Sequence, residues 1–125
     1  MSELLIVTLT LWLECRGESA YGRELVATVI WNRMQERGLP AHEVCIQPRQ
    51  FSCWNKKPHI VESECTGPVW RHCRRLAIEL CNGTFVPSNG ANHYYNPALC
   101  SPRWAKNMQV IVREDQHVFL REGKG

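Results

Sequence analysis

The sequence predicts a mainly helical α+β fold with a small antiparallel sheet toward the C-terminus. Two observations carry this prediction. Helical patterns occupy residues 3–15, 20–37 and 68–82, whereas short β-type runs follow after residue 90. Helices and strands that are separated along a chain in this way typically form an α+β fold, in which the sheet packs against the helices.

Length and composition are those of one globular domain, which we expect to span residues 1–125. Hydrophobic residues make up 44% of the chain and charged residues 22%, which excludes a disordered protein. The net charge of +3 favours an anionic partner only weakly and does not identify one. We therefore sought the function in particular residues.

The first predicted helix, residues 3–15, is the apolar run ELLIVTLTLWLEC, with Ser2 as its N-cap and Gly17 as its stop. It is too short to span a bilayer and lacks the basic start of a signal peptide. We expect a buried helix and no stable membrane insertion. We also expect synthesis in the cytoplasm without a signal peptide.

Glu14 ends this apolar run. Burial disfavours the charged form of an acid, so such a residue is either paired or kept protonated as a proton donor. We favour the proton donor. Gly17 predicts a turn directly after the helix, so we expect Glu18 to point away from Glu14.

The next two helices are marked by apolar stripes and by end signals. In the helix at 20–37 the stripe ends before Gly38, and Arg33 is either a cation at the helix C-terminus or a buried tie to the loop that carries the acids. The helix at 68–82 begins with Pro68 and ends at Asn82-Gly83. We expect its three arginines to face solvent.

The stretch between these helices, residues 39–59, contains three prolines and is predicted to be rich in loop. It contains Gln50, Phe51 and Ser52 close to Trp54, a combination that suits a carbohydrate-binding edge because amides bond hydroxyls and aromatic faces stack on sugar rings. Phe51 and Trp54 could equally plug the core beneath the loop.

Toward the C-terminus we expect a short strand at His93, Tyr94 and Tyr95. A hairpin should follow, with the strands MQVIV and HVFLR around a polar turn at 113–116. His117 lies in the second strand, where a histidine is more often structural than functional.

The seven cysteines are odd in number and form no CxxC pair. We therefore expect thiols rather than disulfides, and no metal or other cofactor. Cys65, Cys73 and Cys81 are spaced by eight residues, which we interpret as small buried thiols along one helical face.

This inventory fits the cleavage of a glycan, which needs a carboxylic acid of raised pKa to protonate the leaving oxygen. The usual glycosidase has two carboxylates, and here the second is Glu18 or none.

Four segments in order resemble the cell wall hydrolases typified by the catalytic domain of the spore cortex-lytic enzyme SleB. ECRGESAYGRELVATVIWNR resembles the opening EARGE motif and the helix after it, and QFSCW resembles the QFS loop. ANHYYNP…SPRW resembles the YYxNP…W segment, although no residue here separates the tyrosines from Asn96-Pro97. QHVF resembles the closing H-x-F. Cys15 stands where the family tends to have alanine.

The resemblance implies a lysozyme-like domain that acts on peptidoglycan as a lytic transglycosylase, cleaving between N-acetylmuramic acid and N-acetylglucosamine. One glutamate suffices in that scheme: it protonates the glycosidic oxygen, and its carboxylate then takes the proton of the muramyl C6 hydroxyl to close a 1,6-anhydro ring. That glutamate is Glu14 here. The resemblance places the following residues in substrate binding: Glu18, Gln50, Phe51, Ser52, Tyr94, Tyr95, Asn96 and Trp104.

Three alternatives remain open. A hydrolytic muramidase would use Glu14 and Glu18 on the same bond, an amidase would need zinc, and a small basic module would bind nucleic acid. We expect a monomer whose partner is peptidoglycan and not nucleic acid. A phage or prophage endolysin, released to the wall from the cytoplasm, suits the absence of an export signal.

Overall fold

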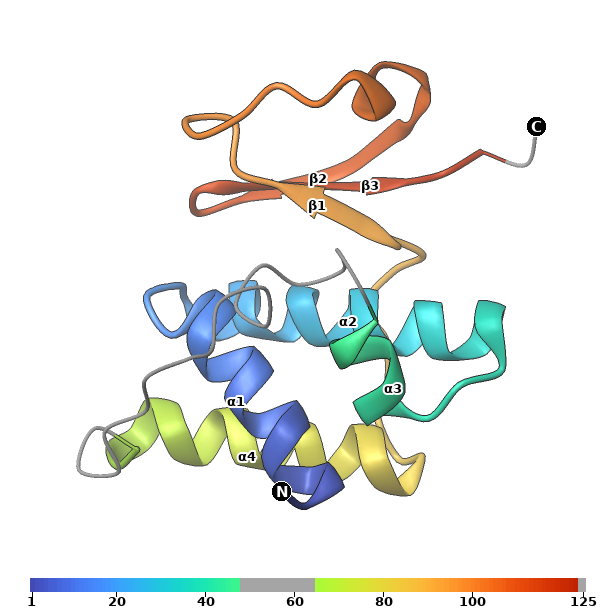
Figure 1. Cartoon of the computed structure of the whole chain (residues 1–125). Coiled ribbons are helices and arrows are strands. Elements are labelled where there is room, and N and C mark those ends of the chain that lie inside the picture. Colours follow the sequence, from blue (N-terminus) through green and yellow to red (C-terminus); the bar gives the residue numbers. More distant parts are fainter. Residues whose placement is uncertain (48–64, 124–125) are drawn as a thin grey trace.

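A computed structural model describes residues 1–47 and 65–123, in which a layer of helices carries a small sheet along one side (Figure 1). The helices are α1 (Glu3–Cys15), α2 (Ala20–Arg37), α3 (Ala41–Ile46), α4 (Gly67–Asn82) and the 3-10 helix η3 (Arg103–Asn107). The strands are β1 (His93–Tyr95), β2 (Gln109–Glu114) and β3 (His117–Arg121). The α+β prediction is confirmed.

Capping chemistry sets the ends of α1. The backbone N–H of Leu5 donates to Oγ of Ser2 at 3.1 Å, as an N-cap requires. Thr8 and Thr10 are buried, and their hydroxyls donate back to carbonyls one turn earlier, at 2.7 and 2.8 Å. These bonds let a nearly all-apolar helix bury its threonines without unsatisfied hydroxyls.

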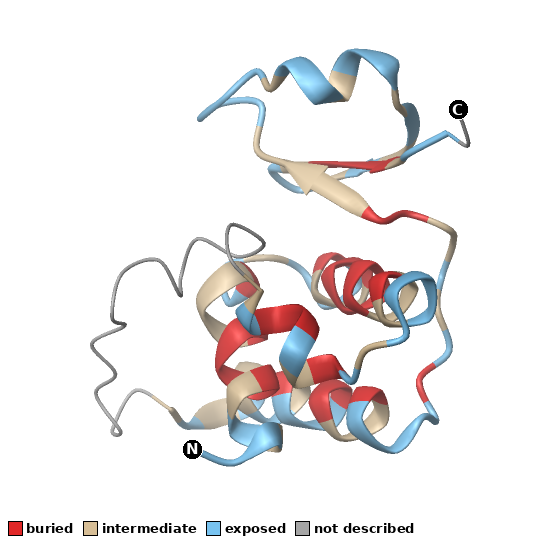
Figure 2. Cartoon of the chain, turned by 45° about the vertical axis from the view of Figure 1, so that its right-hand side comes forward, coloured by how far each residue is buried: buried red, intermediate tan, exposed pale blue. Residues whose placement is uncertain are grey.

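The predicted limits of α2 are confirmed, and those of α4 differ by one residue. Ser19 caps α2 by accepting from the N–H of Gly22 at 3.0 Å, and Gly38 ends the helix with φ +63°. Gly83 ends α4 with φ +81°. Left-handed backbone at the residue after a helix favours glycine. Most residues of the two predicted stripes are buried in one core that also includes residues of α1, while Met34 and Val69 are half-buried (Figure 2).

Two features of the helical half differ from expectation. Residues 39–59 were expected to be loop-rich, and the short helix α3 within them was not predicted. It forms because Ala41, Val44 and Cys45 all pack into the core, and six residues are too few to show a periodicity. The cysteines at eight-residue spacing do not share a buried face. Cys73 is buried, Cys65 is half-buried before the helix, and Cys81 is exposed. Eight residues turn a helix by about 80° beyond two full turns, enough to move Cys81 off the core face.

The sheet is antiparallel with the order β1-β3-β2, so β3 is its central strand. Val118, Phe119 and Leu120 are buried as that position demands. In the hairpin Glu114 pairs with His117, and Asp115 occupies the turn with φ +53°. Both the predicted hairpin and the predicted strand at 93–95 are confirmed.

The main core lies among the helices, and Phe119 from the sheet joins it (Figure 2). Trp12 of α1 meets Trp70 of α4 edge to face, with ring centroids 5.6 Å apart. Within the described residues, no helix combines the length and apolar composition needed to cross a membrane.

Candidate active site

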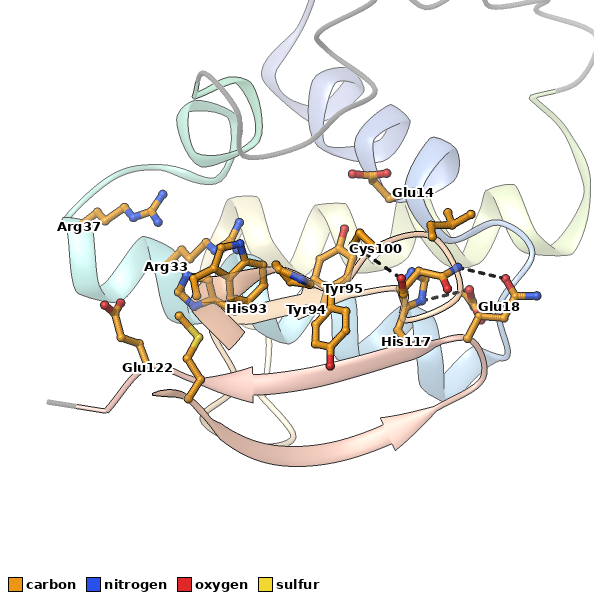
Figure 3. A pocket seen from close by; sticks show the side chains of 16 residues that line it. Glu14, Glu18, Arg33, Arg37, His93, Tyr94, Tyr95, Cys100, His117 and Glu122 are labelled. Carbon is orange, nitrogen blue, oxygen red and sulfur yellow. Dashed lines mark hydrogen bonds and ion pairs between the residues drawn. The ribbon is translucent and has the colours of Figure 1, made fainter. Parts of the chain in front are cut away.

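A cleft of about 890 Å³ lies between the helical layer and the sheet (Figure 3). Its walls come from the end of α1, the loop after it, α2, the sheet and the segment that includes η3. The lining residues are Glu14, Glu18, Arg33, Arg37, His93, Tyr94, Tyr95, Asn96, Leu99, Cys100, Pro102, Trp104, Met108, Gln116, His117 and Glu122.

Glu14 reaches the cleft from the last turn of α1 (Figure 3). Burial raises the pKa of its carboxyl above the ordinary value, and a hydrogen bond with the Tyr94 hydroxyl partly opposes this shift. The apolar helix therefore does what its sequence predicts, and holds one acid toward its protonated form at the edge of a polar cleft.

Glu18 lies in the same cleft, so the expectation that it points elsewhere is wrong. The turn after α1 is tight, because the N–H of Glu18 donates to the carbonyl of Cys15 at 3.1 Å, and Glu18 thus stays close to the end of the helix. Its Oε1 lies 3.1 Å from Nδ1 of His117, and the two side chains are only 10% and 12% exposed.

Burial shifts both members of the Glu18–His117 pair toward their neutral forms. It raises the pKa of Glu18, and the nearby charge of Asp115 adds to that shift. It also lowers the pKa of His117, which Asp115 partly opposes. An ionised Glu18 only accepts hydrogen bonds, so in the pair of a carboxylate with a neutral imidazole the ring proton lies on Nδ1 and Nε2 is left as an acceptor.

Two further contacts hold the loop of Glu18 in place. Asp115 Oδ2 accepts from the backbone N–H of Ser19 at 3.0 Å and from its hydroxyl at 2.7 Å, and the Ser19 hydroxyl bond is the main reason that the pKa of Asp115 is lowered. Arg23 donates to the Glu18 carbonyl at 2.6 Å and to Nδ1 of His72 at 2.8 Å. The loop between α1 and α2, residues 16–19, is called the acid loop below. These bonds fasten it to the β2–β3 turn and to α4.

Aromatic side chains form another wall of the cleft. Tyr94 meets His117 edge to face, with centroids 5.2 Å apart. Tyr95 and His93 both contact Trp104, at 6.0 and 5.3 Å between centroids. Trp104 remains 43% exposed, so much of its surface is available to a ligand.

Arg33 and Arg37 line the cleft from α2. Arg33 is buried, and its Nε donates to the Asn92 carbonyl at 2.8 Å. Arg33 is therefore buried, as one of the two interpretations expected, and this bond ties it to the chain leading into β1. Arg37 donates to the side chain of Gln47.

Six residues predicted from the sequence meet in this cleft: Glu14, Glu18, Tyr94, Tyr95, Asn96 and Trp104. Gln50, Phe51 and Ser52 lie outside the described residues. His117 was assigned to structure, yet it lines the cleft and pairs with Glu18. The match of QHVF to the closing H-x-F motif was the available signal. Among residues 1–47 and 65–123, no group of three or more His, Cys, Asp or Glu is placed to hold a metal ion.

Comparison with known proteins identifies the class. The sequence model of the family described as Cell Wall Hydrolase matches residues 17–120, most of the chain. The chain belongs to the cell wall hydrolase family. The expected class of enzyme is thereby confirmed, although Glu14 precedes the matched residues and its role is not decided by that match.

Curated relatives of this cell wall hydrolase include two spore cortex-lytic enzymes. The enzyme of Halalkalibacterium halodurans is 29% identical over 108 residues, which cover 85% of this chain and 31% of the relative. That of Oceanobacillus iheyensis is 27% identical over 114 residues, covering 86% of this chain and 37% of the relative. The chain thus spans about a third of the length of these relatives.

The fold matches two solved structures. The catalytic domain of the germination-specific lytic transglycosylase SleB from Bacillus anthracis aligns with a TM-score of 0.73 at 23% identity, covering 95% of this chain and 93% of that one. The catalytic domain of the Bacillus cereus SleB protein gives the same TM-score and identity, and 89% of it is covered. The expected SleB-like fold is confirmed.

Proposed function

We propose that this cell wall hydrolase cleaves the bond between N-acetylmuramic acid and N-acetylglucosamine in peptidoglycan as a lytic transglycosylase, with Glu14 as the proton donor. The observation that carries the proposal is the placement of Glu14. It is a mostly buried carboxyl with a raised pKa at the edge of an open, aromatic-lined cleft. A general acid works best with a pKa raised toward the working pH, and burial shifts the pKa of Glu14 in that direction.

In this reaction Glu14 gives its proton to the glycosidic oxygen, and the bond from that oxygen to muramyl C1 breaks. The C6 hydroxyl of the same muramyl unit then bonds to C1, which closes the 1,6-anhydro ring, and its proton passes to a base, which in the single-glutamate scheme is the carboxylate of Glu14. No water enters the product. Tyr94 donates a hydrogen bond to Glu14 and so stabilises the carboxylate that remains after proton transfer.

The walls of the cleft suit a glycan. Its volume of about 890 Å³ is within the range that holds a small oligosaccharide. Trp104 and Tyr95 offer aromatic faces for sugar rings, while Asn96 and Gln116 offer amides for hydroxyls and acetamido groups.

A hydrolytic muramidase is the second candidate, and one observation favours it. Glu18 lies in the same cleft as Glu14, as the second carboxylate of a glycosidase would. Its Oε1 is engaged by His117, however, which makes Glu18 less available to activate water itself.

Mass spectrometry of fragments released from purified peptidoglycan tests the proposal. The wild-type chain should release fragments with 1,6-anhydro-muramic ends, and Glu14→Gln should release none. Glu43→Gln is the matched control, since Glu43 is an exposed acid on α3 away from the cleft. Reducing muramic ends would establish the muramidase instead. Free peptide stems, or an active Glu14→Gln variant, would contradict the proposal.

The expectations of one domain, a monomer, and release to the wall from the cytoplasm stay predictions. Light scattering of the purified chain would test the monomer, and fractionation of the source cells would test the location.

A further inference from the structure

His117 has one ring nitrogen held and the other open. Nδ1 lies 3.1 Å from Oε1 of Glu18. Within the described part of the chain no hydrogen bond reaches Nε2, and the ring is one of the surfaces that line the cleft. A histidine held by a carboxylate at Nδ1, in a residue that lines a substrate cleft and with Nε2 unbonded in the described residues, can serve as a general base.

The ring orientation is fixed from three sides. Glu18 holds Nδ1, Tyr94 packs edge to face at 5.2 Å, and Phe119 lies at 6.0 Å on the same strand. The turn before His117 is fastened to the acid loop by the two bonds from Ser19 to Asp115.

We propose that His117 is the general base of the reaction, accepting the proton of the muramyl C6 hydroxyl on Nε2, and that Glu18 is the positioning residue that holds its Nδ1. This inference rests on the proposed function, because it keeps the substrate, the bond and the donation by Glu14. It changes the group that accepts the second proton. A single glutamate then no longer has to serve both steps, and the presence of Glu18 in the cleft is explained without a hydrolytic role.

The proton and electron balance is complete. Glu14 loses a proton to the leaving oxygen, which takes the electron pair of its bond to C1. The C6 oxygen forms a bond to C1, and its proton passes to Nε2. The product state contains a carboxylate at Glu14 and an imidazolium at His117, and exchange of one proton with solvent at each residue restores the enzyme.

The surrounding charges support a base that is neutral at rest. The titratable groups facing His117 are Glu18 from the acid loop, Asp115 and Glu114 from the hairpin, and Tyr94 from β1, with Glu14 beyond Tyr94. Burial keeps the pKa of His117 below its ordinary value, so the ring is uncharged near pH 7. Once Nε2 gains a proton, the carboxyl group already against Nδ1 stabilises the imidazolium.

The test measures the pH dependence of 1,6-anhydro end formation. In the wild-type chain the rate should rise with pH as His117 loses its proton, with a midpoint below pH 6.5. His117→Gln should lower kcat by about 100-fold or more with KM little changed, and the rising limb should vanish. His42→Gln is the control, because His42 lies on α3 and is not among the residues that line the cleft. This variant should leave the rate and its dependence on pH unchanged.

A wild-type product without 1,6-anhydro ends would overturn the proposed function, whatever the His117 variant does. Anhydro ends that are lost in Glu14→Gln but made at full rate by a folded His117→Gln would overturn this inference alone. If His117→Gln does not melt cooperatively, Glu18→Gln replaces it. Loss of the carboxylate lowers the pKa of the imidazole, so the rising limb should move to lower pH. An unmoved limb in Glu18→Gln would overturn the inference.

Discussion

The bonds between Ser19 and Asp115 fasten the acid loop to the hairpin turn, and Ser19→Ala tests what they contribute. The substitution removes two contacts. Gly22 loses the acceptor of its N–H, at 3.0 Å, and Asp115 loses the hydroxyl that donates to it at 2.7 Å. The backbone bond from Ser19 to Asp115 survives, because alanine keeps its N–H.

The loss can be estimated from these contacts. Removing a serine N-cap costs about 1 kcal/mol. A hydrogen bond to a carboxylate that is largely in solvent adds about 0.5 kcal/mol after screening. The sum of about 1.5 kcal/mol should lower the Tm of a chain of this size by about 6 °C.

The pH dependence separates the two contributions. Bonding to Ser19 lowers the pKa of Asp115 in the folded state below its ordinary 3.8. A lowered carboxyl pKa adds stability above the unfolded value, which is lost as the pH falls through the folded value. The difference between the wild type and Ser19→Ala should therefore narrow below about pH 4, leaving only the cap contribution.

Thermal melts at pH 7 and pH 3, followed by circular dichroism, make the measurement. Ser2→Ala is the matched control, because Ser2 also caps a helix, through Leu5, but contacts no carboxylate in the described residues. It should cost about 1 kcal/mol or less at both pH values. If both variants cost the same and respond equally to pH, the contact between loop and hairpin contributes nothing and the reasoning fails.

The remaining predictions concern single groups of the site. Folding raises the pKa of Glu14, so ionisation of Glu14 destabilises the fold above pH 4.5. Glu14→Gln should therefore melt at a higher temperature than the wild type at pH 7. An equal or lower Tm would refute this. Tyr94→Phe removes a hydrogen bond that lowers the pKa of Glu14, so the fall of activity at high pH, where Glu14 ionises, should move to higher pH. Tyr21→Phe, at an exposed tyrosine, should leave that fall in place. An unmoved fall in Tyr94→Phe would contradict the assigned bond. Burial raises the pKa of Cys15 well above 9.0, whereas Cys100 is exposed. A thiol reagent at pH 7 should therefore label Cys100 in the folded chain and Cys15 only after unfolding, which peptide mapping would measure. Labelling of both at equal rates would contradict the burial of Cys15.

The ends of the long helices could be read from the sequence because they depend on local chemistry. Ser2 and Ser19 cap within their own first turns, and Gly38 and Gly83 adopt the left-handed backbone that ends a helix. None of these contacts needs a distant partner. α3 escaped prediction for the opposite reason, since only the surrounding core selects its six residues.

The residues of the site also differ in whether local sequence or a distant contact determines their role. Glu14 could be found because an acid on an apolar run is a local anomaly. The pairing of Glu18 with His117 could not, since the two residues lie in segments brought together only by the folded hairpin. The expectation that Gly17 would turn Glu18 away failed because the bond from the N–H of Glu18 to the carbonyl of Cys15 keeps Glu18 close to the end of α1.

These contacts suggest why the acid loop and the hairpin belong to one functional unit. Glu14 stands on the last turn of α1, and its one assigned contact with the sheet, the hydrogen bond with Tyr94, opposes the rise of its pKa instead of causing it. The orientation of His117 depends on both layers, because its strand supplies the ring while the loop after α1 supplies Glu18 and Ser19. A change that loosens the sheet from the helices should therefore disturb the Glu18–His117 pair before it disturbs the proton donor. Donation of the first proton and acceptance of the second would then fail separately, which makes the contact between Ser19 and Asp115 a point at which the two steps can be uncoupled by mutation.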